Sequence, residues 1–219
     1  MNNGFVKVAA ATPKIKVGDC GYNGAQICKI IDEVYDNGAQ LVVFPELCIT
    51  GYTCSDLFWQ KSMLDMAKTH LQFIAEHCED KEIVAIVGLP MIYRSKLYNV
   101  AAVIYDGEIL GLVPKTYIPN YSEFYEARHF TAGRAFEGMV NWYGREVPFG
   151  QNLLFVCEEL PQLVTGTVAR VLHHKVGPLD RASHHRTACH ELTEGTAPLI
   201  PHHKALPWYC LPQCTAFFP

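Results

Sequence analysis

Hydrophobic residues occur along this chain as short runs separated by stretches with helical spacing. Residues 5–11, 41–44 and 83–89 are apolar runs with the length of buried strands. Residues 22–37 and 61–78 place apolar side chains three and four positions apart, which is typical of helices that pack by one face. Because these strands alternate with the helices, the pattern favours an α/β fold.

A hairpin is expected after the second helix. Residues 97–105 and 108–113 are strand candidates, and the Asp-Gly dipeptide at 106–107 favours the tight turn that joins two antiparallel strands. Further β-like runs occupy residues 153–157 and 162–168. A hairpin that follows alternating strands and helices predicts a mixed sheet.

The pattern is lost after about Thr165. Seven of the ten histidines and six of the thirteen prolines lie beyond it, and neither a helical nor a strand period runs through this part. We therefore expect one domain over 4–164 and an atypical His/Pro-rich tail over 165–219. The tail's composition is typical of a shifted reading frame or an aberrant splice. The alternative is a divergent extension with a role of its own, such as metal binding.

Composition and charge narrow the function further. The chain has 219 residues, 49% of them hydrophobic, and a net charge of -4 without any run of Lys and Arg, which argues against binding nucleic acid. It has no apolar stretch near the roughly 20 residues of a membrane span, and no signal-peptide pattern. Its nine cysteines are an odd number, so we expect reduced thiols in a soluble cytoplasmic protein.

The first candidate for chemistry is a carboxylate at the end of a predicted strand. Glu46 follows Phe44-Pro45, and catalytic groups in α/β sheets emerge where strands end. A partly desolvated glutamate in such a place can act as a general base. The alternative interpretation is a loop glutamate that caps the next turn.

The second candidate is a lysine at another strand end. Lys115 follows Val113-Pro114 and precedes a segment rich in tyrosine. A lysine beside carboxylates and aromatic rings can stabilise an oxyanion. The alternative is a surface lysine that pairs with Glu123 or Glu126, a contact that contributes little to stability.

Taken together, the two spans and their surroundings carry a resemblance to a known family. The motifs occur in this order: Phe-Pro-Glu-Leu-Cys-Ile-Thr-Gly-Tyr at 44–52, Gly-Leu-Pro at 88–90, Leu-Tyr-Asn-Val-Ala at 97–101, Pro-Lys-Thr-Tyr-Ile-Pro-Asn-Tyr-Ser-Glu-Phe-Tyr-Glu at 114–126, and Pro-Phe-Gly at 148–150. Over about residues 4–164 the chain resembles the carbon–nitrogen hydrolase (nitrilase) superfamily. Within it, the tyrosine-rich segment and the start of the chain resemble the N-terminal glutaminase domain of bacterial glutamine-dependent NAD synthetases.

The resemblance implies a fold and a mechanism. The fold would be an αββα sandwich, here incomplete at its C-terminal end. By motif, Glu46 resembles the general base, Lys115 the residue that stabilises the oxyanion, Glu123 the second glutamate that positions the lysine, and Tyr121 a tyrosine of the glutamine pocket. A cysteine thiolate would attack the carboxamide of L-glutamine and release ammonia, and water would then hydrolyse the thioester.

The same resemblance implies partners and cofactors. The domain would need no metal and no organic cofactor of its own. ATP would belong to a synthetase domain that is missing from this sequence and that uses the ammonia to make NAD. Family members assemble as oligomers, so a homo-oligomer is expected.

One element of the family pattern is missing. The stretch that corresponds to the nucleophile segment reads Gly-Thr-Val-Ala-Arg-Val at 166–171 and holds no cysteine. Cys157, in Val-Cys-Glu-Glu-Leu, is an alternative nucleophile, although it matches the preceding strand better. Cys48 and Cys54 match the loop beside the base and are expected as core or pocket-wall thiols. Three hypotheses remain: a glutaminase domain, a catalytically inactive relative that acts as a binding module, and a stand-alone amidase that uses Cys157.

Overall fold

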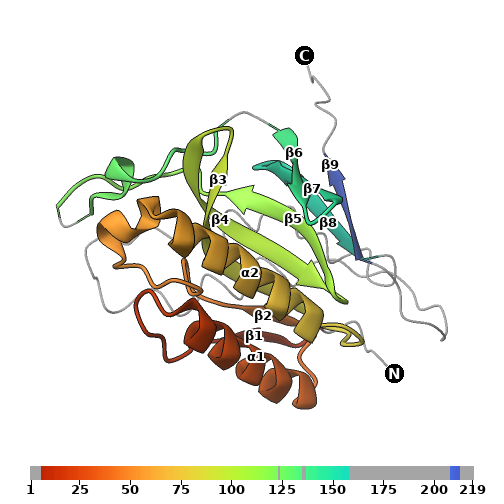
Figure 1. Cartoon of the computed structure of the whole chain (residues 1–219). Helices are drawn as coiled ribbons and strands as arrows, with labels where there is room; N and C mark the ends of the chain where they lie inside the picture. Colours follow the sequence, from red (N-terminus) through yellow and green to blue (C-terminus); the bar gives the residue numbers. More distant parts are fainter. Residues whose placement is uncertain (1–5, 123, 135–136, 158–207, 213–219) are drawn as a thin grey trace, which may run out of the picture.

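The fold is built on a mixed sheet of seven strands. It is seen in a computed structural model that describes residues 6–122, 124–134, 137–157 and 208–212. The strands lie in the order β1-β2-β3-β4-β5-β7-β6 (Figure 1). Their bounds are β1 Val8–Ala10, β2 Leu41–Val43, β3 Val84–Tyr93, β4 Lys96–Tyr105, β5 Glu108–Pro114, β6 Glu137–Trp142 and β7 Arg145–Gly150. Strands β1, β2 and β3 are parallel, and β3, β4 and β5 are antiparallel, as an α/β fold with a mixed sheet predicts.

Two helices cover one face of this sheet. Helix α1 spans Cys20–Asp36 and helix α2 spans Lys61–His77, within two residues of the bounds that the hydrophobic spacing predicts. The side chain of Asp19 caps α1 by accepting from the backbone N–H of Tyr22. Gly38 ends the helix with a φ of 78°, a conformation that glycine adopts without strain. No helix of the described residues is long and apolar enough to cross a membrane.

The strands β3, β4 and β5 are joined by two tight hairpins. Asp106 and Gly107 have φ of 45° and 76°, which confirms the predicted turn between β4 and β5. Arg94 and Ser95 form an equivalent turn between β3 and β4, with φ of 46° and 62°. Because neither residue is glycine or asparagine, the sequence carries no strong signal for this second turn.

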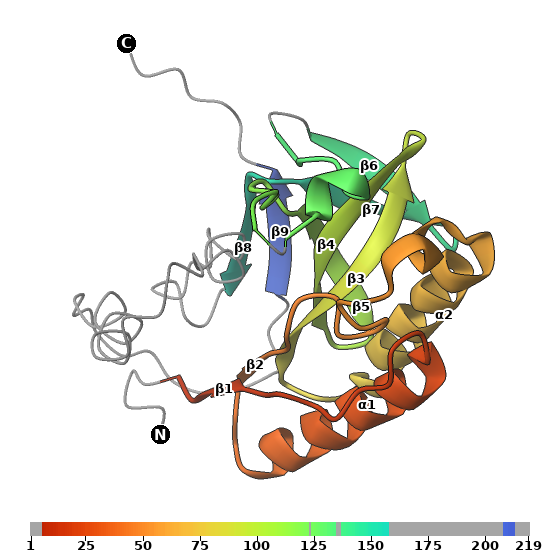
Figure 2. The same cartoon turned by 90° about the vertical axis from the view of Figure 1, so that its left-hand side faces the viewer.

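A two-stranded sheet lies against the other face of the large sheet. It pairs β8 (Leu153–Cys157) with β9 (Trp208–Pro212) in antiparallel register, and Figure 2 shows it on the side away from α1 and α2. Leu153 and Phe155 approach Gly111 of β5 so closely that a Cβ there would lie 3.0 Å from both. The sheet is therefore packed on both faces, and apolar residues alternate between the two sides of β3 and β4.

Three strands differ from the sequence prediction. The hairpin of β6 and β7, which turns at Tyr143-Gly144, was not expected because its residues alternate weakly and include several charges. Strand β9 lies within the tail, where no strand period was found, because five residues are too few to show one. The predicted run at 162–168 lies outside the described residues.

Candidate active site

Glu46 is held at the end of β2 by a tight turn of the backbone. Leu47, directly after it, has a φ of 53°, and the amide of Gly51 donates to the carbonyl of Leu47 at 2.7 Å. The turn lies on Gly88 of β3, where a Cβ would come within 2.4 Å of the backbone nitrogen of Leu47. Only glycine permits this approach, so Gly88 determines how far the Glu46 backbone reaches over the sheet.

Lys115 is fixed by backbone hydrogen bonds on both sides. It follows the last residue of β5, and its amide donates to the carbonyl of Asn99 at 2.8 Å. Its carbonyl accepts from the amide of Gly133, also at 2.8 Å. A Cβ on Gly133 would lie 2.5 Å from the ring of Pro114, so this contact also requires glycine. The lysine side chain therefore starts from a backbone with little freedom.

The ammonium group of Lys115 lies between two carboxylates. Its Nζ is 2.7 Å from Oε1 of Glu46, and 2.9 Å and 2.8 Å from Oε1 and Oε2 of Glu126. The side chains of Lys115, Glu46 and Glu126 are 11%, 27% and 6% exposed. Ion pairs with so little exposure are screened weakly by salt, and loss of either partner leaves a charge uncompensated.

Two further side chains complete this cluster. The amide nitrogen of Asn99, a buried residue of β4, donates to Oε1 of Glu46. The hydroxyl of Tyr52 donates to Oε1 of Glu126 at 2.7 Å. Burial, followed by this hydrogen bond to the carboxylate, raises the pKa of Tyr52, so the phenol remains a donor at neutral pH.

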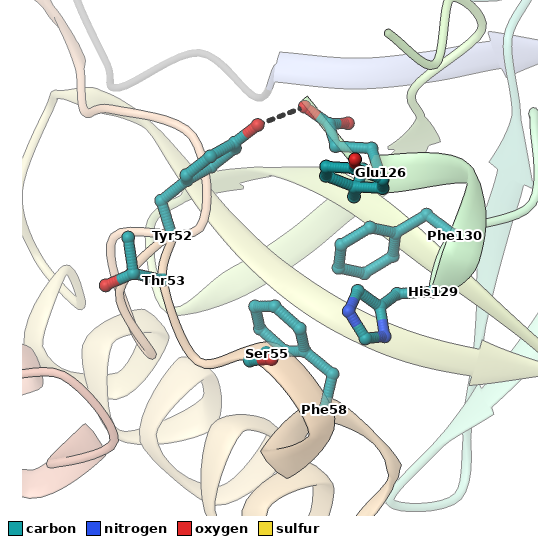
Figure 3. Close-up of a pocket in the computed structure, with 8 residues that line it drawn as sticks. Tyr52, Thr53, Ser55, Phe58, Glu126, His129 and Phe130 are labelled. Carbon is teal, nitrogen blue, oxygen red and sulfur yellow. Dashed lines mark hydrogen bonds between the residues drawn. The ribbon is translucent and has the colours of Figure 1, made fainter. Parts of the chain in front are cut away.

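A pocket opens beside Glu126, between two short 3₁₀ helices. One spans Ser55–Trp59 and the other Glu126–Arg128, and contacts between them include the ion pair of Arg128 with Asp56 at 2.9 Å. The pocket measures about 240 Å³, and Figure 3 shows Tyr52 and Glu126 meeting at one end of it, with aromatic rings along the wall. Its lining consists of Tyr52, Thr53, Ser55, Phe58, Tyr125, Glu126, His129 and Phe130. The geometry is that of a carboxylate and ammonium cluster beside an aromatic recess, which suits acid–base chemistry on a small polar substrate.

The sequence of the chain matches that of a known protein family. The sequence profile of the carbon–nitrogen hydrolase family matches residues 7–161. The chain belongs to the carbon–nitrogen hydrolase family. The described part of this hydrolase domain, with its mixed sheet and helices, is an α/β fold like that of nitrilase-type proteins.

Curated relatives of the hydrolase domain carry a common name. A glutamine-dependent NAD(+) synthetase of Mycobacterium tuberculosis (strain ATCC 25618 / H37Rv) is 40% identical over 162 residues, which are 74% of this chain and 24% of that protein. One of Aquifex aeolicus (strain VF5) is 37% identical over 156 residues, covering 71% and 26%. The chain thus spans between 24% and 26% of the length of these two relatives and matches their N-terminal part.

Solved structures show the same likeness. The crystal structure of a glutamine-dependent NAD(+) synthetase from Cytophaga hutchinsonii matches with a TM-score of 0.64 and 29% identity, over 68% of this chain and 25% of that one. An amidase from Nesterenkonia sp. AN1, solved in complex with acrylamide, matches with a TM-score of 0.52 and 22% identity, over 68% and 56%. At that identity the second match shows the fold alone.

The structure brings together two of the four site residues predicted from the sequence. Glu46 and Lys115 are in direct contact. Tyr121 is 58% exposed and packs edge-on against Phe124; within the described residues it makes no hydrogen bond to this cluster. The Glu123 prediction lies outside the described residues. These two assignments therefore stay predictions.

Three site residues were missed by the sequence analysis. Glu126 was weighed only as a surface partner of the lysine, yet it is the carboxylate that contacts Lys115 by both oxygens. Asn99 is an isolated amide in an apolar strand, which is a usable signal because a buried amide needs partners. Tyr52 is the last residue of the motif at 44–52; in the structure it lines the pocket, and its hydroxyl donates to Glu126.

The five described cysteines are all buried free thiols. Burial raises the pKa of Cys48 to about 12 and raises that of Cys54 as well. Cys48 donates to the carbonyl of Gly88 at 3.7 Å, and Cys54 to the carbonyl of Thr50 at 3.1 Å. Both therefore behave as core thiols, and a thiol with a raised pKa is a poor nucleophile near pH 7. The side chain of Cys157 lies outside what the structure describes.

A metal site would need several His, Cys, Asp or Glu side chains close together. Among the described residues, no group of three or more His, Cys, Asp or Glu side chains has an arrangement that would hold a metal ion. The sequence analysis left metal binding open only for the tail at 165–219, whose side chains lie outside what the structure describes.

Proposed function

We propose that this chain carries the general-base and oxyanion part of a glutaminase site, and that it derives from a glutamine-dependent NAD synthetase. The observation that carries the proposal is the largely buried contact of Lys115, which follows β5, with the carboxylates of Glu46, after β2, and Glu126, in the second 3₁₀ helix. The family supports amide hydrolysis, and the names of its relatives support glutamine as the amide.

Each residue of the cluster has a role that follows from its chemistry. Glu46 takes the proton of a cysteine thiol, and the electron pair left on sulfur attacks the carboxamide carbon of L-glutamine. The ammonium of Lys115 stabilises the negative oxygen that forms on that carbon. Glu46 returns its proton to the leaving nitrogen, and ammonia departs. Water, deprotonated by Glu46, then hydrolyses the thioester.

Glu126 and Tyr52 support this chemistry by holding the ammonium group of Lys115 in place. Glu126 holds Lys115 through both oxygens, so the ammonium stays in place while its bond to Glu46 changes. Tyr52 holds Glu126 from the pocket side. Such preorganised charges need no reorganisation when the transition state forms, and this is the main source of their effect.

The nucleophile determines whether this chain is active. The five cysteines whose side chains are described are buried, and their burial raises their pKa values, so the thiol has to come from Cys157 or from the tail. Without such a thiol the chain would be an inactive relative that binds glutamine at most. Alkylation of the chain, followed by mapping of the modified cysteine and measurement of glutamine hydrolysis, identifies any thiol that takes part.

Other properties of the proposed domain follow the family. It requires no cofactor of its own, and ATP would act in a synthetase domain of the full-length relatives. We further propose a cytoplasmic homo-oligomer without nucleic-acid or membrane partners. Size exclusion with light scattering tests the oligomer, and a sharp monomer peak contradicts it.

Ammonia release from L-glutamine tests the proposed function. We expect Glu46→Ala and Lys115→Met to abolish it, because the first removes the base and the second the charge that stabilises the oxyanion. Glu108→Gln and Lys61→Met are matched controls, since both residues lie in exposed ion pairs. Absence of ammonia from the wild-type chain at high protein concentration contradicts activity, and turnover that survives Glu46→Ala contradicts the assigned base.

A further inference from the structure

Asn99 is a polar residue in the middle of an apolar strand. It is 3% exposed in β4, where its neighbours Tyr98 and Val100 are buried as well. A buried amide that lacks hydrogen bonds costs about 1–3 kcal/mol, so the groups it binds indicate why it is there. A valine or leucine would fill the same space without this cost.

The contacts of Asn99 reach both charged residues of the site. Its side-chain nitrogen donates to Oε1 of Glu46, and its backbone carbonyl accepts from the amide of Lys115 at 2.8 Å. Asn99 therefore orients the carboxylate of Glu46 and also fixes the backbone from which the Lys115 side chain extends. These two groups come from β2 and β5, which are not neighbours in the sheet.

Both hydrogen bonds to the Glu46 carboxylate end on the same oxygen. Oε1 accepts from Asn99 and from Nζ of Lys115, the latter at 2.7 Å. Within the described residues, Oε2 of Glu46 has no donor. Two donors on one oxygen fix the rotation of the carboxylate, which a single contact to a flexible lysine leaves free.

We propose that Asn99 is a positioning residue that anchors Oε1 of Glu46 and so assigns proton transfer to Oε2. An amide suits this task because it donates a hydrogen bond and does not compete for the proton. Oε2 takes the proton from the attacking group and later returns it to the leaving nitrogen. The catalytic part of this inference rests on the proposed function, whereas the anchoring of the carboxylate does not.

The test compares Asn99→Asp and Asn99→Ser with wild type in the full chain. The pH midpoint at which Glu46 takes up its proton is followed by NMR on its carboxyl carbon. Asn99→Asp replaces a donor by a carboxylate, and we expect it to move the midpoint upward by at least about one pH unit. Asn99→Ser, which is neutral and smaller, is expected to move it upward by about half a unit. The serine variant carries the test if the aspartate variant does not fold.

Asn23→Asp is the matched control for a buried asparagine. Asn23 is 0% exposed, and its side-chain nitrogen donates to the carbonyls of Lys16 and Ile49. The substitution introduces the same chemical change at a side chain that has no hydrogen bond to the Glu46 carboxylate, so it is expected to lower stability without moving the midpoint. A midpoint that is unchanged in both Asn99 variants, or shifted equally by Asn23→Asp, overturns the proposal.

Kinetics adds a second readout. Where the wild type releases ammonia, Asn99→Ser is expected to lower kcat about tenfold or more with little change in KM, since in this proposal Asn99 acts through Glu46 and not on the substrate. An unchanged kcat overturns the positioning role. A wild-type chain without ammonia release counts against the proposed function alone, because the NMR midpoint still decides whether Asn99 anchors Glu46.

Discussion

At the scale of single residues, the site is a row of charged and polar side chains linked by hydrogen bonds and ion pairs. Lys115 lies between Glu46 and Glu126. Asn99 donates a hydrogen bond to Oε1 of Glu46, and Tyr52 donates one to Oε1 of Glu126. Two carboxylates close together repel one another, and the ammonium offsets this repulsion. Changes to the cluster are therefore expected to affect stability as well as activity.

Glu126 and Glu123 can be distinguished as partners of the lysine by a pair of variants. Glu126→Gln removes the charge that contacts Nζ by both oxygens, and we expect the free energy of unfolding to fall by about 2 kcal/mol. Glu123→Gln is expected to change it by less than about 0.5 kcal/mol. Urea unfolding measures both. A larger effect of Glu123→Gln would support the sequence-based prediction that Glu123 is the positioning glutamate.

Buried thiols make the fold sensitive to alkaline pH. Burial raises the pKa of Cys28, Cys48 and Cys78 from 9.0 to about 12, so the folded state keeps protons that the unfolded state loses above pH 9. The stability is intact below pH 9 and falls as the pH rises from 9 toward 12. Each thiol is expected to remove about 1.4 kcal/mol between pH 8 and 10.

Urea unfolding with reductant at pH 8 and pH 10 checks this prediction. Cys78→Ala removes one of the thiols, so the loss of stability between the two pH values should be smaller by about 1.4 kcal/mol in the variant. An equal loss in variant and wild type would show that the Cys78 thiol does not titrate in this way.

At the scale of elements, glycines decide how closely the site-bearing turns approach the sheet. Gly88 of β3 permits the close approach of the turn at Glu46, and Gly133 permits the close approach of its own segment to Pro114, directly before Lys115. The short helices that flank the pocket are joined by the ion pair of Asp56 with Arg128 and by ring contacts of Phe58. The position of Glu126 therefore depends on packing between segments about 70 residues apart in the chain.

Gly88→Ala tests the close approach. Its Cβ would lie 2.4 Å from the nitrogen of Leu47 and 2.9 Å from the carbonyl oxygen of Pro45, so the backbone around Glu46 has to move. We expect a loss of about 1–3 kcal/mol in stability and changed NMR shifts at Glu46 and Asn99. Gly21→Ala is the control, since its Cβ would meet His70 at an ordinary 3.5 Å. Unchanged shifts at Glu46 in Gly88→Ala would contradict this prediction.

At the scale of the whole molecule, the large sheet is covered by helices on one face and by β8 with β9 on the other. Strand β9 comes from the tail and pairs with β8 along its whole length, from Leu153 opposite Pro212 to Cys157 opposite Trp208. Without β9, strand β8 would expose unpaired backbone groups at its edge. This part of the tail therefore contributes to the fold, whatever the origin of its sequence.

Two truncated chains test the contribution of β9. A chain that ends at Pro207 lacks the strand, and we expect its thermal midpoint to fall by about 5 °C or more. A chain that ends at Pro212 keeps the strand and is expected to unfold near the wild-type temperature. Thermal unfolding followed by circular dichroism measures both. Equal midpoints for the two chains would show that β9 does not stabilise the protein.

The sequence determined the elements whose signals are local. Hydrophobic spacing indicated both helices and the strands β1, β2, β3, β4, β5 and β8, and the Asp-Gly dipeptide indicated one hairpin turn. The motifs around Glu46 and Lys115 indicated the family, because several short motifs in a fixed order along the chain are far more specific than any one of them. Such features depend on a few neighbouring residues, so they can be found without the fold.

The tertiary structure decided which side chains meet. Glu126 lies 11 residues from Lys115, Asn99 lies 53 from Glu46 and Tyr52 lies 74 from Glu126, and no local pattern relates them. The turn at Arg94-Ser95 forms because the flanking strands β3 and β4 pair, although neither residue favours a positive φ, and β9 is fixed by its pairing with β8, about 50 residues earlier in the chain. Contacts between distant segments depend on the packing of the whole sheet, and that packing is settled only when the chain folds.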